Sequence, residues 1–210
     1  SVGSIYGILV GIANGLNNGC AIIAARMYGS KNSAMLKRTI AHMLVINFTA
    51  TGLFMMIGLL FINPLMRIME VPETVYNDAR VYLTFILCGM ATTIAYNMCA
   101  AILRAVGDSK TPLLFLIGCS VLNAGLDVLL VIVFKLGIAG AASATIASQA
   151  LSALLCFIYI KCKRAELHIS RKDFVFDFAL FKELLAMGFS MGIITSLVSF
   201  GSAAITRANN

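Results

Sequence analysis

The sequence predicts an all-α membrane protein, in which a multi-span bundle of apolar helices crosses the bilayer. Of the 210 residues, 60% are hydrophobic and only 12% are charged, whereas soluble domains have about 45 to 50% apolar and about 25% charged residues. The chain also contains six apolar stretches of bilayer-spanning length. The net charge of +7 would suit a nucleic-acid-binding protein, but the mean hydropathy of +0.93 favours lipid. We therefore expect membrane lipid and no nucleic acid as a partner.

Each expected span contains the roughly 20 apolar residues that a helix needs to cross a bilayer. The connections carry turn and helix-start residues, such as Asn63-Pro64 and Gly107-Asp108, which favour chain reversal between spans. The expected spans cover residues 4–28, 39–62, 79–103, 112–134, 139–160 and 184–206.

The distribution of Lys and Arg predicts the orientation. Twelve of these residues fall in the first, third and fifth connections, and four fall in the other connections and at the C-terminus. Because short loops rich in Lys and Arg stay in the cytoplasm, we expect a multi-pass protein of the cell membrane with residues 161–183 in the cytoplasm. The first span would then begin outside, so we expect a further helix before Ser1.

The basic segment 161–183 is the longest connection and could divide two helix bundles. Its end, Phe174 to Leu185, has an amphipathic pattern that predicts a stretch lying at the membrane interface. The alternative is a solvated basic loop without a separate role.

Small residues and polar groups both indicate close helix packing. Small residues at every fourth position let helices approach closely in lipid. Amides and hydroxyls near the middle of the first three spans should face the bundle interior, because uncompensated polar groups are costly in hydrocarbon. They either form interhelical hydrogen bonds or line a substrate-sized cavity. The stripes are Gly7, Gly11, Gly15, Gly19 and Gly140, Ala144, Ser148, Ser152, and the candidate cavity residues are Asn14, Asn17, Asn18, Asn47, Thr93, Tyr96 and Asn97.

Asp127 is the only acidic residue deep within an expected span. Placing such a residue at the centre of a membrane helix costs about 2.5 to 3.5 kcal/mol, so other groups must compensate it. Asn123 lies four residues earlier, on the same helix face. In an antiparallel hairpin centred near residue 136, Asp127 lies at the depth of Thr145, and Asn123 at the depth of Gln149.

A carboxylate surrounded by amide and hydroxyl oxygens suits a hard monovalent cation or a proton. We therefore predict a cation-binding site at Asp127, Asn123, Thr145 and Gln149, which would take Na+ or H+. The alternative is that the Asp127 carboxyl only ties two helices together. Asp108 has a simpler role, because it is placed to accept hydrogen bonds in the turn before Pro112.

Other kinds of chemistry find no support in the sequence. The chain lacks the second in-membrane carboxylate of an aspartyl protease, the HExxH pattern of a zinc protease and a GxxxxGK[ST] phosphate loop. We expect a protein that is not an enzyme, with no cofactor other than a coupling ion. The six cysteines lie in or beside apolar runs without metal-ligand spacing, so we expect them to be small buried apolar residues.

Three blocks of sequence resemble the multidrug and toxic compound extrusion (MATE) family. They are the string LRAVGDSKTP at residues 103–112, then Asn123 with Leu126-Asp127, and then GIAGAASAT at residues 137–145. The resemblance implies one six-helix lobe of a pseudo-symmetric two-lobe transporter, and the chain would cover its second to seventh transmembrane helices. Residues 1–160 would be the N-terminal lobe without its first helix, 161–183 the cytoplasmic linker, and 184–210 the first helix of the C-terminal lobe.

The resemblance also implies a function. Members of the family export drugs and organic cations in exchange for Na+ or H+, and the Asn, Asp and Thr of the cation site in several prokaryotic members match Asn123, Asp127 and Thr145. We therefore expect a cation-coupled antiporter that works by alternating access on a small, cationic and amphiphilic substrate, as a monomer when full length. The alternatives are a lipid-linked precursor flippase of the same superfamily and a membrane scaffold that transports nothing. The chain departs from the family at Gly188-Phe189-Ser190, where many members have Gly-x-Pro.

Overall fold

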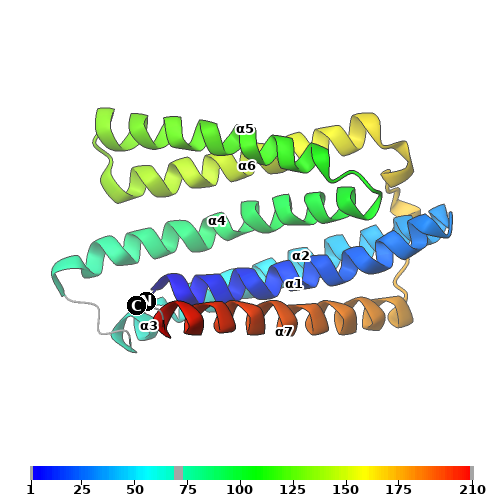
Figure 1. The fold of residues 1–210 in the computed structure, drawn as a ribbon, viewed down its shortest axis with the longest axis horizontal. Helices are drawn as coiled ribbons and strands as arrows, with labels where there is room; N and C mark the ends of the chain where they lie inside the picture. The colour runs from blue at the N-terminus through cyan, green and yellow to red at the C-terminus, as the bar shows by residue number, and fades with distance from the viewer. Residues whose placement is uncertain (1, 69–72, 209–210) are drawn as a thin grey trace.

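The computed structural model describes residues 2–68 and 73–208. Within these ranges the regular structure is helical, and the long helices lie side by side as an elongated bundle (Figure 1). This confirms the predicted all-α class. The elements are α1 (Val2–Gly29), α2 (Ser33–Leu60), α3 (Ile62–Ile68), α4 (Glu73–Ala105), α5 (Lys110–Asp127), the π-helix η1 (Val128–Val133), α6 (Gly137–Lys163), the 3-10 turns η2 (Ala165–Leu167) and η3 (Arg171–Phe174), and α7 (Phe178–Ala208).

Five helical segments in the described ranges are long and apolar enough to cross a membrane. They coincide with the second to sixth expected spans. The first expected span, residues 4–28, lies within the 28-residue helix α1. The protein is thus a membrane-integral helical bundle, as its composition predicts. The five segments are Ser33–Leu60, Ala79–Ala105, Lys110–Val133, Gly137–Lys163 and Phe178–Thr195.

Local signals explain where the helices begin and end. Asn32 precedes α2 and its side chain accepts a hydrogen bond from the backbone N–H of Met35 at 3.0 Å, which satisfies a free donor of the first turn. Gly107 ends the turn after α4 with a φ of +86°, and Gly137 starts α6 with a φ of +55°. Glycine adopts these left-handed conformations without steric cost, so both turns can be tight.

The helices form two groups. One contains α1, α2 and α7, the other contains α4, α5 and α6, and the groups meet where α1 contacts α4. α1 contacts α7, α2 and α4, whereas α6 contacts α4 and pairs with α5 at the edge of the bundle (Figure 1). The main apolar core lies between α1, α2 and α4 and includes the fully buried Ile23, Met43 and Leu103. The α5–α6 pair therefore lies against this core on one side only, which is where the polar groups described below are found.

Glycines bring α1 and α7 together, as the small-residue stripe predicts for part of its length. A Cβ atom on Gly19 would lie 2.6 Å from Gly188 Cα, and one on Gly15 would overlap Gly192. A Cβ on Gly11 would meet no atom within 4 Å, so this position does not take part in the contact. At the other end of the pair, Arg26 forms an ion pair with Glu183. The second stripe is also buried, at Gly140, Ala144, Ser148 and Ser152.

The connection before α7 differs from the expectation. The stretch Phe174 to Leu185 is not one continuous element, because α7 begins only at Phe178 and its buried Leu180 and Leu184 join the core. The carboxylate of Asp177 accepts hydrogen bonds from the N–H groups of Ala179 and Leu180. It thereby starts the helix about one and a half turns before the expected residue 184.

The cysteines follow the expectation in part. Cys20, Cys99, Cys119 and Cys156 are buried, as predicted, but Cys88 and Cys162 are exposed. All six are free thiols. In a bilayer an exposed residue of a spanning helix can face lipid instead of water, so the apolar character of Cys88 still fits its place on α4.

Candidate cation site between α5 and α6

The helix that carries Asp127 changes its winding directly after this residue. α5 ends at Asp127 and continues as the π-helix η1, in which the N–H of Phe134 donates to the carbonyl of Leu129 at 3.0 Å, five residues earlier. Such wide turns inside α-helices occur frequently at functional sites, because they shift the side chains on either side out of regular register. The sequence carries no residue type that would have revealed this turn.

A small pocket lies between α5 and α6. α6 packs against α5 along its length (Figure 1), and each helix contributes four lining residues. The pocket volume is about 50 Å³, which is enough for a few water molecules or one small ion and far too little for a drug-sized molecule. The lining residues are Leu116, Cys119, Ser120, Asn123, Thr145, Ser148, Gln149 and Ser152.

Several buried polar atoms on this helix pair have no hydrogen-bond partner among the described residues. They are Asn123 Nδ2, Asp127 Oδ1, Ser148 Oγ and Gln149 Oε1. Buried polar atoms in folded proteins are nearly always paired, because an unpaired one costs about 1 to 3 kcal/mol. Three of the four are oxygens that can coordinate a cation, and the fourth belongs to an amide whose own oxygen can do so. These unpaired atoms are of the kind that a cation site would use.

The structure brings three of the four predicted cation-site residues to one pocket. Asn123, Thr145 and Gln149 line it together, as an antiparallel hairpin centred near residue 136 requires. Asp127 is not a lining residue, but its Oδ1 is buried in protein. The Thr145 hydroxyl donates to the carbonyl of Ala141 at 3.1 Å, which leaves its oxygen lone pairs available to a ligand. The sequence pattern assigns Ser148 only to the packing stripe and does not reveal its unpaired hydroxyl.

The seven predicted cavity residues have different surroundings. Asn17 is fully buried with both polar atoms unpaired, whereas the Asn47 amide donates to Met43 O at 2.8 Å beside a pocket between α2 and α4. Tyr96 donates to Pro112 O at 3.0 Å and so joins α4 to α5. Asn18 accepts a hydrogen bond from Arg104 at 3.3 Å. The remaining three, which are half-buried, are Asn14, Thr93 and Asn97.

Asp108 has the predicted role and a further one. Its carboxylate accepts from the N–H of Thr111 at 3.1 Å, which confirms that it satisfies a donor at the start of α5. It also accepts from Tyr159 Oη at 3.1 Å and from Arg164 Nη2 at 2.7 Å, both from the end of α6 or just beyond it. Burial alone would raise the pKa of Asp108, but the hydrogen bonds from Arg164, Thr111 and Tyr159 outweigh it and lower the pKa to about 2.

Comparison with known proteins gives the class to which the fold belongs. The MatE family model matches residues 1–129. Two similar curated relatives, both from Bacillus subtilis (strain 168), are the probable multidrug resistance proteins YoeA, which is 30% identical, and YpnP, which is 34% identical. The alignments cover 96% and 93% of this chain but 45% and 44% of the relatives, so the chain spans somewhat less than half of their length.

Solved structures give the same result for the fold. The chain matches an outward-facing multidrug resistance MATE family transporter with a TM-score of 0.86 and 25% identity, over 98% of this chain and 47% of that one. It matches an inward-facing structure of such a transporter with a TM-score of 0.85 and 25% identity, over 91% and 44% of the two chains. The architecture is that of a membrane transporter. The chain belongs to the MatE family.

Proposed function

We propose that the protein is a cation-coupled antiporter of the cell membrane that exports drugs or organic cations, and that this chain provides its cation-binding half. The observation that carries the proposal is the set of unpaired buried polar atoms at Asn123, Asp127, Ser148 and Gln149, which adjoins a pocket of ionic size. Membership of the MatE family supports the transport function.

The coupling ion in this proposal is Na+ or H+. For Na+, the Asp127 carboxylate supplies the negative charge while amide and hydroxyl oxygens replace the water shell. For H+, the carboxylate itself takes the proton and becomes neutral, which removes the cost of a buried charge. In both cases binding changes the charge between α5 and α6, and the same residues form the binding site.

The transport step in this proposal is a movement of the whole helix bundle. Ion binding at the α5–α6 pair would favour one of two arrangements of this half against the other half of the transporter. The similarity of this chain to both an outward-facing and an inward-facing relative supports such a movement, because a half that moves as one body keeps its internal structure. The basic segment 161–183 would lie in the cytoplasm and join the two halves.

The two alternatives have less support. In a purely structural role, the Asp127 carboxylate would tie the two helices together through hydrogen bonds, yet its Oδ1 has no partner among the described residues. A flippase for an anionic lipid-linked precursor needs a cationic cavity, whereas the lining residues of the α5–α6 pocket are all uncharged and Asp127 beside it is acidic.

The substitution Asp127→Asn tests the proposal, since it keeps the size of the side chain and removes its charge. Vesicles that contain the full-length protein are loaded with a cationic dye, and efflux is measured after a Na+ or H+ gradient is imposed. We expect gradient-driven efflux to fall at least tenfold. The matched control is Asp173→Asn, which removes one carboxylate from the connection before α7, where asparagine can still accept the hydrogen bonds of the Ser170 turn. Unchanged coupling in the Asp127→Asn protein would refute the proposal.

A further inference from the structure

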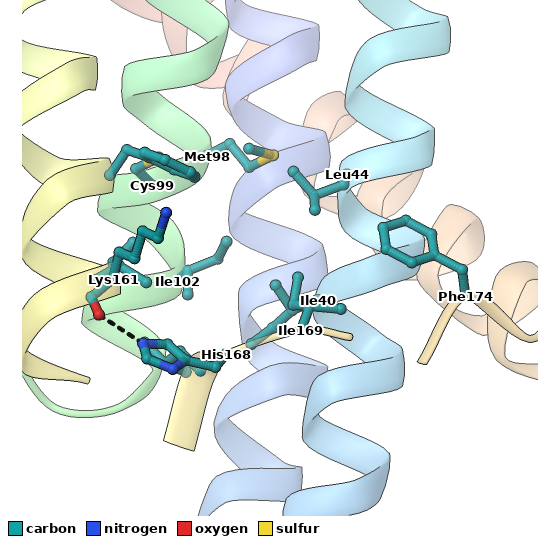
Figure 2. A pocket seen from close by; sticks show the side chains of 12 residues that line it. Ile40, Leu44, Met98, Cys99, Ile102, Lys161, His168, Ile169 and Phe174 are labelled. Atoms are coloured by element: carbon teal, nitrogen blue, oxygen red, sulfur yellow. Dashed lines mark hydrogen bonds between the residues drawn. The ribbon is translucent and has the colours of Figure 1, made fainter. Parts of the chain in front are cut away.

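A larger cavity than the α5–α6 pocket lies at the end of the bundle where residues 161–183 connect α6 to α7. Its volume is about 450 Å³, within the range of small-molecule sites. The walls come from α2, α4 and α6, and residues 167–169, at and after the end of η2, together with Phe174 of η3 close it from the side of the connection (Figure 2). This cavity shares no residue with the α5–α6 pocket.

The lining of this cavity combines apolar walls with two basic groups. Ten of the twelve lining residues are apolar, and none is acidic. The polar exceptions are Lys161 and His168, which lie together on one side, away from Leu44 and Phe174 on the other (Figure 2). His168 Nε2 donates to the carbonyl of Lys161 at 2.7 Å, which holds the imidazole beside the lysine.

The charges around this basic side are also predominantly positive. Lys163, Arg171 and Lys172 are exposed nearby in sequence. The four acidic groups of segment 161–183 have partners of their own. Glu166 pairs with Arg164 at 3.6 Å, and Glu183 pairs with Arg26. Asp173 accepts from Ser170 at 2.7 Å, and Asp177 accepts from the N–H of Ala179 at 3.0 Å. A ligand with an apolar body and an anionic head would therefore meet complementary groups in both parts of the cavity.

Exposed aromatic residues favour contact with membrane lipid at this end of the bundle. Phe174 is 50% exposed, Phe176 62% and Phe178 70%, in the stretch that joins the cavity to α7. Apolar side chains next to basic ones are typical of segments that lie in the headgroup region of an anionic membrane. The cavity and the leaflet around it would thus be continuous.

We propose that this cavity binds one acyl chain of an anionic phospholipid from the surrounding leaflet, with the headgroup phosphate held by Lys161 and His168. The apolar walls from α2, α4 and α6 enclose the chain, and burial of its methylene groups supplies most of the affinity. The bound lipid then fixes residues 167–174 against the bundle. Because these residues lead into α7, lipid binding stabilises the start of the helix that would open the other half of the transporter.

The test compares two lysines in the last turn of α6. Lys161 lines the cavity and Lys163 does not, although both are exposed. The full-length protein is reconstituted with equal parts of phosphatidylglycerol and phosphatidylcholine, extracted gently, and analysed by native mass spectrometry for retained lipid. We expect the wild type to retain phosphatidylglycerol preferentially. Lys161→Gln should reduce the preference for phosphatidylglycerol about fivefold, as expected for the loss of one lysine at an anionic surface. Lys161→Arg and Lys163→Gln should keep the preference.

Two further measurements distinguish lipid binding in the cavity from lipid binding to general surface charge. Ile169→Trp fills the cavity from the non-helical segment, where the backbone can adapt, and should reduce phosphatidylglycerol retention while leaving all charges in place. Excess inorganic phosphate should not displace the lipid, because the phosphate alone lacks the apolar chain. Equal losses in Lys161→Gln and Lys163→Gln, equal retention of both lipids by the wild type, or displacement by phosphate would overturn the proposal.

Discussion

At the scale of single residues, two half-buried carboxylates, those of Asp108 and Asp127, have opposite surroundings. Asp108 accepts hydrogen bonds from Thr111, Tyr159 and Arg164, and Arg164 is itself half-buried. Asp127 has a buried oxygen without a partner in the described ranges, on a helix that widens directly after it. A carboxylate that accepts several hydrogen bonds is fixed in place, whereas one with unused oxygens can take up an ion. This contrast supports a structural role for the first and a binding role for the second.

The ion pair between Asp108 and Arg164 predicts that the stability of the protein depends on pH. Because the folded protein holds the pKa of Asp108 at about 2, below the ordinary 3.8, the pair contributes its full stability above the ordinary value and loses it as the pH falls through about 2. Arg164→Gln should therefore lower the free energy of unfolding by about 1 to 3 kcal/mol at neutral pH, measured by thermal unfolding in detergent.

The difference between wild type and Arg164→Gln should shrink as the solution is acidified, since protonated Asp108 no longer attracts a guanidinium. Arg171→Gln provides the control, because Arg171 is an exposed residue of the same connection and should change stability little at any pH. A destabilisation by Arg164→Gln that does not depend on pH would show that Arg164 acts through packing and not through the Asp108 carboxylate.

At the scale of elements, the contact between α1 and α7 depends on glycine. A Cβ on Gly19 would lie 2.6 Å from Gly188 Cα, whereas one on Gly11 would meet nothing within 4 Å. Gly19→Ala should therefore separate the helices and destabilise the protein by about 1 to 3 kcal/mol. Gly11→Ala makes the same change on the same helix and should be neutral or slightly stabilising, because alanine favours helix more than glycine. Equal melting temperatures for the two variants would contradict this account.

The sequence predicts the helices well and their ends less well. Hydrophobic length places each span on an observed helical segment to within a few residues, because an apolar run of about 20 residues has few other stable forms in a membrane. The start of α7 is not predicted correctly, because Asp177 lies between Phe176 and Phe178, ahead of the expected span, and its capping hydrogen bonds depend on local geometry. The π-helix after Asp127 could not be predicted, since it is defined by backbone hydrogen bonds that no particular residue type requires.

Prediction of the candidate site from the sequence has the same limit, because spacing gives the depth of a residue but not its hydrogen bonds. Antiparallel geometry brings Asn123, Thr145 and Gln149 to one pocket, because residues equally far from a hairpin turn lie at equal depth. The position of the Asp127 side chain relative to that pocket depends on the widened turn, which the regular helix spacing does not include. The involvement of Ser148 follows from which hydroxyls remain unpaired, and this is a property of packing that sequence spacing does not express.

At the scale of the whole molecule, the chain is a helical unit that resembles about half of transporters solved in two opposite orientations. The α5–α6 pair lies at one edge of this unit and α7 at the other (Figure 1). In the proposed mechanism, an ion bound between α5 and α6 would act on transport through α4 and α1, which lie between these edges and pack on both sides. The unit has to be stiff for this to work, and its close glycine contacts and buried core meet that requirement.

The most direct test of the central claim is the release of the coupling ion when substrate binds. The purified full-length protein in weakly buffered detergent solution is mixed with a cationic substrate, and released H+ or Na+ is recorded with a pH dye or a sodium electrode. The account predicts that the wild type releases ions on substrate addition and that Asp127→Asn binds the substrate but releases none. Equal release from both proteins would show that the coupling ion binds elsewhere.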